Sequence, residues 1–353
     1  MSKDAYLNEI SLAVPDHDVH RKFIDFAPGL LSDDRDKKLF RRMAGRCQIE
    51  HRYSVLPANA EAGRLDAHGF YAPGAFPDTE TRMRFFQEHA FPLARRALDQ
   101  LKLADRKDEV THLILTTCTG FYAPGLDIEV VEHYGLKPSV ERTIVGFMGC
   151  YAGMNALKLA RHIVRSDNAA RVLILNIELC TLHLKPTDNL EQMLSFLLFA
   201  DGCSASIVSA EEKGIELQSF HSTVMPESGD QITWAIGGSG FDMNLSGKVP
   251  GTIAAGLPAC LPDILSGCGM HQFRHWAIHP GGRTVLDAVR EGADLPEELL
   301  ESSRRVLRDF GNMSSATIMF VLKDIMQRGD GRGCGMAFGP GLTVESLLFQ
   351  QAA

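Results

Sequence analysis

Strand and helix signals alternate twice along this chain, and this alternation restricts the possible folds more than any other feature. From residue 110 onward, apolar and β-branched runs of strand length are followed by stretches with apolar residues at every third or fourth position. Each round closes on two successive strand signals, at 204–209 and 215–220 and again at 336–338 and 343–349, which we expect to form hairpins. The sequence therefore predicts an α/β fold made of two similar halves.

The expected elements are defined by residue range. The first round has helices at 81–103, near 127–134 and from 150 onward, with strands at 110–117, 143–147 and 172–179. The second has strands at 232–236, 241–245 and 273–278, with helices at 249–265, 282–290, 296–310 and 314–327. We place the boundary near 210–215, which gives two domains at 1–212 and 213–353.

Composition narrows the classes of partner. The chain has 353 residues, a formal net charge of -8 and 23% charged residues, which argues against broad binding of nucleic acid or anionic membranes. No apolar stretch reaches membrane-spanning length, and the first residues lack the apolar core of a signal peptide. We expect a cytoplasmic protein without nucleic-acid or membrane partners, in which an anionic ligand would need a local basic pocket.

The cysteines and histidines do not suggest a metal site. None of the eight cysteines forms a Cys-x-x-Cys pair, so disulfide and zinc frameworks are not expected. His271, His275 and His279 are four apart and would share one face of a helix. The Trp-Ala-Ile run between them and the following Pro280 argue against a continuous helix, so we expect no metal.

Cys150 stands where a strand signal changes into a helix signal. The β-branched run 143–145 ends in Gly-Phe-Met-Gly, and apolar residues recur with helical spacing after the cysteine. A thiol at a helix N-terminus is expected to ionise more easily, and the thiolate is the nucleophilic form. The alternative is a small buried apolar residue, which is the more common role of an isolated cysteine.

Two further segments carry polar residues at similar transitions. His279 ends a short apolar strand, and Pro280 followed by two glycines leads into the next helix. Asn312 lies in a Gly-Asn loop between two helices, where Ser314 or Ser315 can cap the second. Each segment alone is more often structural, since His-Pro and Gly-Asn turns are common loop formers.

Taken together, a cysteine, a histidine and an asparagine at the mouths of α/β units predict nucleophilic acyl chemistry. A cysteine can accept an acyl group from a thioester, and an adjacent imidazolium would keep that cysteine ionised. Asparagine and histidine N–H groups can donate to an enolate or thioester oxyanion, with each donor contributing about 3 kcal/mol in comparable sites. Decarboxylation of a malonyl thioester requires this kind of stabilisation.

A basic cluster near the N-terminus offers a binding site for phosphates. Lys38, Arg42 and Arg46 follow one another at intervals of four and would share one helical face. In an acidic protein such a face can hold the phosphates of a nucleotide-bearing ligand such as coenzyme A. The alternative is a solvated helix face whose charge is neutralised by the acidic residues at 33, 34 and 36.

Four segments, in order, resemble those of a known enzyme family: Gly-Phe-Met-Gly-Cys-Tyr-Ala-Gly (146–153), Trp-Ala-Ile-His-Pro-Gly-Gly (276–282), Gly-Asn-Met-Ser-Ser-Ala (311–316) and Phe-Gly-Pro-Gly-Leu-Thr-Val-Glu (338–345). They resemble the type III polyketide synthases, the chalcone-synthase-like group of the thiolase superfamily, in a bacterial-type form. The resemblance runs from about residue 38 to the C-terminus.

The resemblance implies a duplicated thiolase-like fold with α/β/α/β/α layers, acting as a homodimer. Cys150 in the N-terminal half would carry the acyl chain. His279 and Asn312 in the C-terminal half would hold the malonyl thioester and promote its decarboxylation. Acyl-CoA and malonyl-CoA would be the substrates, and no further cofactor is implied.

The same resemblance suggests binding residues. Arg42 and Arg46 match positions that contact coenzyme A phosphates, whereas Lys38 is one residue away from the third such position. The remaining suggestions concern the cavity: Phe338 would line it, Cys118 would shape it, Ala123 would reach the neighbouring subunit's pocket, and His183 (or Leu182) and Met243 would replace two gatekeeper phenylalanines.

Three rival functions share parts of this pattern. A ketoacyl synthase III-like enzyme also combines Cys, His and Asn, but it condenses once and takes malonate from a carrier protein. A papain-like protease has the same order of residues, although the sequence around Cys150 is unlike a protease motif. A non-enzymatic protein that binds acyl-CoA would leave Cys150 unacylated. We expect the iterative polyketide synthase, which condenses a starter acyl-CoA with malonyl-CoA and then cyclises the product.

Overall fold

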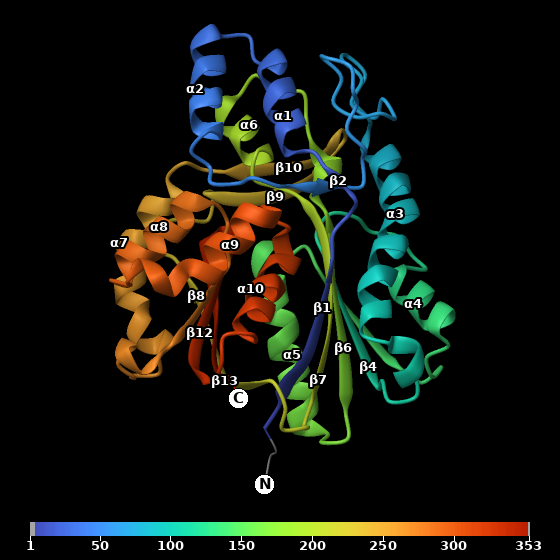
Figure 1. Cartoon of the computed structure of the whole chain (residues 1–353), viewed down its shortest axis with the longest axis vertical. Helices are drawn as coiled ribbons and strands as arrows, with labels where there is room; N and C mark the ends of the chain where they lie inside the picture. The colour runs from blue at the N-terminus through green and yellow to red at the C-terminus, as the bar shows by residue number, and fades with distance from the viewer. Residues whose placement is uncertain (1–3, 352–353) are drawn as a thin grey trace.

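The computed structural model of the protein describes residues 4–351. Its core is a mixed sheet of nine strands (Figure 1). In spatial order they are β11 (His275–Ile278), β12 (Gly331–Gly339), β13 (Thr343–Gln351), β8 (Ile215–Val224), β1 (Tyr6–Ala13), β7 (Asp201–Ser209), β6 (Arg171–Leu179), β4 (His112–Thr117) and β5 (Glu141–Gly146).

The first expected hairpin does not form. Strand β1, which was not predicted, lies between β7 and β8 and pairs antiparallel with both. Leu7 and Asn8, and again Ile10 and Ser11, are buried side by side, so β1 has both faces covered and lacks the apolar–polar alternation of a half-exposed strand. The second expected hairpin is confirmed, since β12 and β13 pair antiparallel. Gly331 lies opposite Gln351 at one end of the hairpin, and Gly339 lies opposite Thr343 at the other.

Helices divide the sheet into the layers expected of a thiolase-like fold. The helices α5 (Ala152–Ser166) and α10 (Thr317–Ile325) pack against each other at the centre. Helix α3 (Thr79–Gln100) covers β1, β6 and β7 from outside, and α4 (Leu126–Tyr134) packs on α3. On the opposite side α7 (Val249–Ile264) covers β8 and β13, with α8 (Arg283–Gly292) packed on α7. Figure 1 shows this α/β/α/β/α order, with α5 and α10 in the middle.

The remaining elements gather at one end of these layers. Figure 1 shows α1 (His20–Phe26), α2 (Asp34–Ala44) and α6 (Leu190–Phe196) there, next to the hairpin of β9 (Ile232–Gly237) and β10 (Gly240–Leu245). The short strands β2 (His17–Asp18) and β3 (Tyr53–Ser54) pair in the same region. These segments form the walls of the cavities described below.

Two boundaries differ from the sequence expectation. Helix α2 ends at Ala44 with Gly45 as its C-cap, so Arg46 lies beyond the helix and does not share a helical face with Lys38 and Arg42. The helix expected at 296–310 is a 3₁₀ turn followed by α9 (Glu301–Phe310), and α10 is likewise preceded by a 3₁₀ turn at Ser314–Ala316.

The segment around His275 is a strand, so His271, His275 and His279 do not share one face of a helix.

Within residues 4–351, none of the helices combines the length and the apolar character that crossing a membrane would require.

Candidate active site

Cys150 lies on a tight turn between β5 and α5. After β5 ends, Phe147 has φ 60° and Gly149 has φ 71°, and a 3₁₀ turn over Gly149–Tyr151 leads into α5. A side chain on Gly149 would also place its Cβ 2.3 Å from Pro340 Cδ. Glycine is therefore required there both by its left-handed backbone and by the close packing of the loop after β12.

The backbone of Asn312 is tied to the segment before β7. Its N–H donates to the Leu198 carbonyl at 2.8 Å, and its own carbonyl accepts from the Ala200 N–H at 2.9 Å. Gly311, with φ 69°, allows the chain to leave α9 and turn into this pairing. The position of Asn312 is thus set by main-chain bonds that are independent of its side chain.

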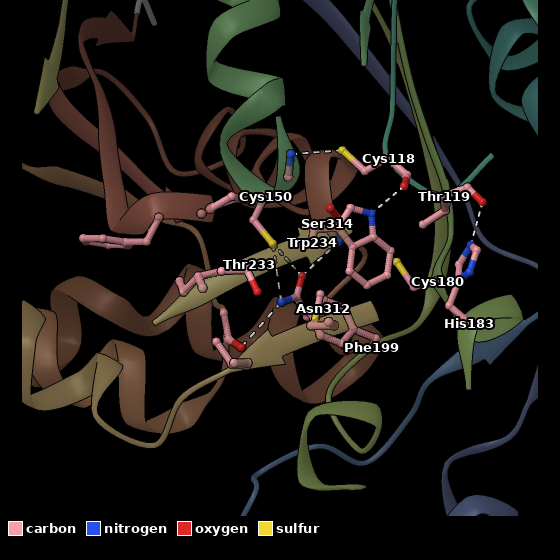
Figure 2. Close-up of a pocket in the computed structure, with 18 of the residues that line it drawn as sticks. Cys118, Thr119, Cys150, Cys180, His183, Phe199, Thr233, Trp234, Asn312 and Ser314 are labelled. Atoms are coloured by element: carbon pink, nitrogen blue, oxygen red, sulfur yellow. Dashed lines mark hydrogen bonds between the residues drawn. The ribbon is translucent and has the colours of Figure 1, made fainter. Parts of the chain in front are cut away.

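The side chain of Asn312 faces Cys150. Its Oδ1 accepts from the Ser314 N–H at 2.8 Å, which leaves Nδ2 to donate toward the Gly281 carbonyl at 3.5 Å. Nδ2 and Cys150 Sγ are 3.9 Å apart, and Figure 2 shows the sulfur directed at the amide. The fold therefore brings together the motif of Cys150 and the motif of Asn312, which are far apart in the sequence.

His279 is buried at the end of β11 with an unused side chain. Its backbone N–H donates to the Met336 carbonyl at 2.8 Å, and within the described part of the chain neither imidazole nitrogen has a hydrogen-bond partner. The residue lies two positions before Gly281, whose carbonyl faces Asn312. Unsatisfied buried polar atoms are costly, and His279 is not among the residues that line the chamber around Cys150 and Asn312.

The protonation states differ from the sequence expectation. Burial raises the pKa of the Cys150 thiol to about 11, although hydrogen bonds from Ser314 and Asn312 lower it. Burial also lowers the pKa of His279 to about 3, so its imidazole is neutral. Burial therefore acts against the predicted thiolate beside an imidazolium, because removal from water disfavours both charges.

Cys150 and Asn312 line a chamber with largely apolar walls. All four residues predicted for the pocket contribute to it: Cys118, His183, Met243 and Phe338. Several wall residues were missed, among them Cys180, Phe199, Thr233 and Trp234. Nothing in the sequence pattern of β9 marks Trp234 as a wall residue.

Two wall residues are locked in place. His183 Nε2–H donates to the Thr119 carbonyl at 2.7 Å, and Nδ1 accepts from the Phe241 N–H at 3.1 Å, which defines a neutral tautomer. Its ring stacks on Phe241 at 4.3 Å between centroids, and burial lowers its pKa to about 3. His183 is therefore a rigid part of the wall rather than a charged group.

Cys118 links the nucleophile turn to the hairpin of β9 and β10. Its Sγ accepts from the Gly149 N–H at 3.0 Å, and its carbonyl accepts from Trp234 Nε1–H at 2.8 Å (Figure 2). Burial, together with the charge of Glu178, raises the pKa of this thiol well above its usual range. Cys118 thus lines the cavity as a structural thiol.

A second cavity lies next to the chamber and is more open to solvent. The two share the lining residues Leu245, Val249, Gly281 and Val285. Arg46 lines this outer cavity, as does Arg283, which was not predicted. Lys38 and Arg42 are exposed on α2 but are not among its lining residues.

The acids near the basic cluster have other partners. Asp33 caps α2 by accepting from the Arg35 N–H at 2.6 Å, and Asp34 pairs with Lys37 at 3.0 Å. Among the described residues no ion pair involves Arg42 or Arg46. Neutralisation of the predicted phosphate-binding residues by these two acids is therefore not observed.

Glu178 is a buried carboxyl behind the chamber wall and gives a pH-dependent prediction. It accepts from the Cys118 N–H, the Thr119 hydroxyl and the Ser315 hydroxyl, yet burial raises its pKa to about 7 from the usual 4.5. The folded protein keeps this proton at pH values where the unfolded chain has lost it. This group therefore lowers stability by roughly 3 kcal/mol as pH rises through that interval.

We expect Glu178→Gln to flatten the pH dependence of the free energy of unfolding between about pH 5 and about pH 8. Urea unfolding at a series of pH values measures the slope for the wild type and the variant. Glu88→Gln, at an exposed position on α3, is the control. Parallel curves for the wild type and Glu178→Gln would show that the carboxyl ionises normally.

This fold and this pairing of a cysteine with an asparagine define an acyl-transferring enzyme of the thiolase-like class. The family description "Chalcone and stilbene synthases, N-terminal domain" matches residues 5–212, and its C-terminal counterpart matches residues 216–353. The chain belongs to this family. It is a type III polyketide synthase, an enzyme that condenses acyl-CoA with malonyl-CoA.

Known proteins agree with this assignment. The chain is 36% identical over 286 residues to the α-pyrone synthesis polyketide synthase-like Pks18 of Mycobacterium tuberculosis, covering 76% of this chain and 72% of that protein. It is 33% identical over 346 residues to bisdemethoxycurcumin synthase of Oryza sativa subsp. japonica, covering 88% of this chain and 83% of that protein.

Solved structures have the same fold. The crystal structure of PKS-I from the brown alga Ectocarpus siliculosus matches with a TM-score of 0.89 and 27% identity, covering 99% of both chains. The type III polyketide synthase domain of Steely1 from Dictyostelium matches with a TM-score of 0.90 at 23% identity, covering 99% of this chain and 100% of that one. The family assignment excludes the protease and the non-enzymatic binding protein, and it favours the polyketide synthase over the ketoacyl synthase.

Proposed function

We propose that Cys150 carries the growing acyl chain and that His279 receives its proton during loading. As Sγ attacks the carbonyl of the starter acyl-CoA, the thiol proton passes to the neutral imidazole, and coenzyme A leaves with that proton. The unpartnered ring nitrogens of His279 and the raised pKa of Cys150 support this order, because a thiol that is neutral at rest needs a base as it attacks.

Decarboxylation would take place at Asn312 and His279. When the malonyl thioester loses CO₂, the electron pair of the broken bond becomes an enolate, and Asn312 Nδ2–H and a His279 N–H donate to its oxygen. The enolate carbon then attacks the thioester on Cys150, and Sγ leaves as the new carbon–carbon bond forms. The extended chain returns to Cys150 for another round and finally closes into a ring in the chamber. No cofactor besides the coenzyme A thioesters takes part.

One observation carries this proposal: Cys150 Sγ and Asn312 Nδ2 are 3.9 Å apart on the wall of a chamber that adjoins a second, more open cavity. The test is incubation of the purified protein with a panel of acyl-CoA starters and free malonyl-CoA, with products identified by mass. We expect triketide or longer products without any carrier protein. Product formation that requires carrier-bound malonate would favour the single-condensation rival instead.

We propose that Arg46 and Arg283 bind the phosphates of coenzyme A in the outer cavity, with Arg42 and Lys38 contributing from the exposed face of α2. Arg46 has no ion pair among the described residues, and the carboxylate nearest Arg283 belongs to Asp287 at 3.9 Å. Both guanidinium groups are therefore available for a charged ligand.

We expect Arg283→Ala to raise the KM for malonyl-CoA roughly tenfold, the usual loss for a charge-assisted hydrogen bond. The KM for the malonyl thioester of N-acetylcysteamine, which has no phosphates, should stay unchanged. Steady-state kinetics with the two thioesters makes the comparison, and Arg274→Ala, an exposed arginine outside the cavity, is the matched control. Equal effects on both thioesters would mean that Arg283 does not bind phosphate.

We propose that the enzyme is a cytoplasmic homodimer of chains with two thiolase-like halves, 1–212 and 213–353. Strand β5 is at the edge of the sheet, and the apolar residues Phe121, Ile144 and Met148 near it are 37%, 46% and 36% exposed. An exposed apolar edge of this kind is normally covered, here by a second copy that Ala123 would approach. Sedimentation of the wild type and of Ile144→Lys, which we expect to be monomeric, tests the interface.

The proposed location in the cytoplasm rests on a different observation. The eight free cysteines suit a reducing compartment.

A further inference from the structure

Helix α2 carries more positive charge than the binding of coenzyme A uses. Four of its cations are exposed and do not line the outer cavity: Arg35, Lys38, Arg41 and Arg42. Their spacing of three and four residues places them on one side of the helix, which we call the cationic side of α2. The proposed coenzyme A site draws on two of the four, so Arg35 and Arg41 are left without a ligand.

The cationic side of α2 is not neutralised by the chain itself. Within residues 4–351, no ion pair involves any of its four cations. Nearby acids are engaged elsewhere: Asp34 pairs with Lys37. Asp188 accepts from the Ser32 N–H at 2.6 Å and from the Ser32 hydroxyl at 2.9 Å. Because the whole chain has a net charge of -8, these cations form a local exception that attracts a negatively charged partner.

The cationic side of α2 lies beside the route to Cys150. Met43, in the last turn of α2, lines the outer cavity, and so does Arg46 just beyond the helix. The outer cavity in turn shares lining residues with the chamber of Cys150. Figure 1 shows α2 at the end of the molecule away from β4, the neighbour of the edge strand β5. A second copy bound at β5 would therefore leave α2 uncovered.

A small acidic protein fits this surface better than a bilayer or a nucleic acid does. Phe40 and Ala44 are buried, so the apolar side of α2 faces the rest of the chain. A helix that binds a bilayer presents its apolar side to the lipid instead. The overall negative charge would repel a long polyanion such as nucleic acid, whereas a small partner can contact the cationic side of α2 alone.

We propose that the cationic side of α2 binds an acidic acyl carrier protein, which delivers a starter acyl group on its phosphopantetheine arm. Coenzyme A contains the same arm, so the arm of the carrier can enter through the outer cavity while carboxylates of the carrier contact Arg35 and Arg41. The inference rests on the proposed role of Cys150 in holding the acyl chain. It concerns the starter alone, because extension still uses free malonyl-CoA.

The transfer is a thioester exchange. Cys150 Sγ attacks the carbonyl carbon of the carrier thioester, and a new carbon–sulfur bond forms. The bond from that carbon to the phosphopantetheine sulfur breaks, and this sulfur leaves with the proton of the Cys150 thiol. The products are acylated Cys150 and a carrier protein with a free thiol, so the exchange needs no oxidant or reductant.

The test compares one acyl group on two donors with the full-length enzyme. The acyl group that gives the highest activity as a coenzyme A thioester is loaded onto a bacterial fatty-acid acyl carrier protein. With malonyl-CoA as extender, kcat/KM for polyketide formation is measured for each donor. We expect the wild type to use both donors, and kcat/KM for the carrier-bound donor to fall more steeply as ionic strength rises.

The principal variant is Arg35→Glu/Arg41→Glu, which reverses two exposed charges outside the coenzyme A site. We expect it to lower kcat/KM about tenfold for the carrier-bound donor and less than about twofold for the coenzyme A donor. The control is Arg84→Glu/Lys102→Glu, which changes the net charge equally at exposed positions on and just after α3. We expect this control to leave both values near those of the wild type.

Activity with the coenzyme A donor alone would overturn the inference, and so would equal use of the carrier-bound donor by the two double variants. If the wild type but not Arg35→Glu/Arg41→Glu bound phosphatidylglycerol vesicles, and the carrier-bound donor gave no product, the cations would belong to a membrane site instead. These results leave the proposed function intact, because the coenzyme A donor reports condensation separately. Absence of product with every coenzyme A donor would refute the function on which the inference rests.

Discussion

Replacing Cys150 with alanine is expected to abolish polyketide formation, with a fall of more than roughly a thousandfold, as for loss of a covalent nucleophile elsewhere. Without the thiol no acyl-enzyme forms, so the enolate has no thioester to attack. Release of CO₂ from malonyl-CoA should persist at a low rate, because Asn312 and His279 remain. Intact-protein mass spectrometry after incubation with an acyl-CoA measures the first step directly: the wild type should gain the mass of one acyl group, and Cys150→Ala should not.

The control for Cys150→Ala is Cys203→Ala. Cys203 is fully buried in β7 and belongs to none of the cavities, so its removal should leave the acyl adduct in place. An adduct of the same mass and stoichiometry on Cys150→Ala would assign the acyl chain to another residue. It would refute the proposed mechanism while leaving the family membership untouched.

The pairing of Cys150 with Asn312 could be predicted from the sequence because each residue precedes a central helix. Cys150 lies in the short 3₁₀ turn that leads into α5, and a similar turn at Ser314–Ala316 connects Asn312 with α10. The two helices pack together between the halves of the sheet. In a duplicated α/β fold, equivalent loops meet at the same place. The positions of the two motifs in the sequence were therefore enough to predict that Cys150 and Asn312 lie close together, even though the hairpin expected around residue 212 was wrong.

The protonation of the site could not be predicted from local sequence. The helix dipole acts on Cys150 with a partial charge of about half a unit, which is a small effect. Burial of the thiol depends instead on the surrounding loops and on Phe338 and Pro340, which line the same chamber from the far end of the chain. Such long-range packing carries no local signature, and in this site it outweighs the dipole.

The cavity walls were only partly predictable for the same reason. Met243 and Phe338 were suggested by resemblance, whereas Trp234 enters the wall through its bond to the Cys118 carbonyl, a contact between residues far apart in the chain.

Replacing Asn312 with aspartate is expected to lower condensation by roughly 10²- to 10³-fold while leaving the loading of Cys150 intact. The change is nearly isosteric, and one carboxylate oxygen can still accept from the Ser314 N–H, so the loop should keep its shape. What is lost is the Nδ2–H donor that faces Cys150 and would stabilise the enolate. The backbone bonds of Asn312 to Leu198 and Ala200 do not involve the side chain, which further protects the fold.

Two measurements separate the steps for Asn312→Asp. Release of labelled CO₂ from carboxyl-labelled malonyl-CoA reports decarboxylation, and the mass of the intact protein reports acylation of Cys150. The expected combination is a normal acyl adduct with slow CO₂ release, since loading uses the thiol and the imidazole whereas the enolate needs the amide donor. Asn244→Asp, at a β10 position that lines neither the chamber nor the outer cavity, is the matched control. CO₂ release at the wild-type rate in Asn312→Asp would mean that the amide does not stabilise the enolate, and that His279 or a backbone N–H carries this function alone.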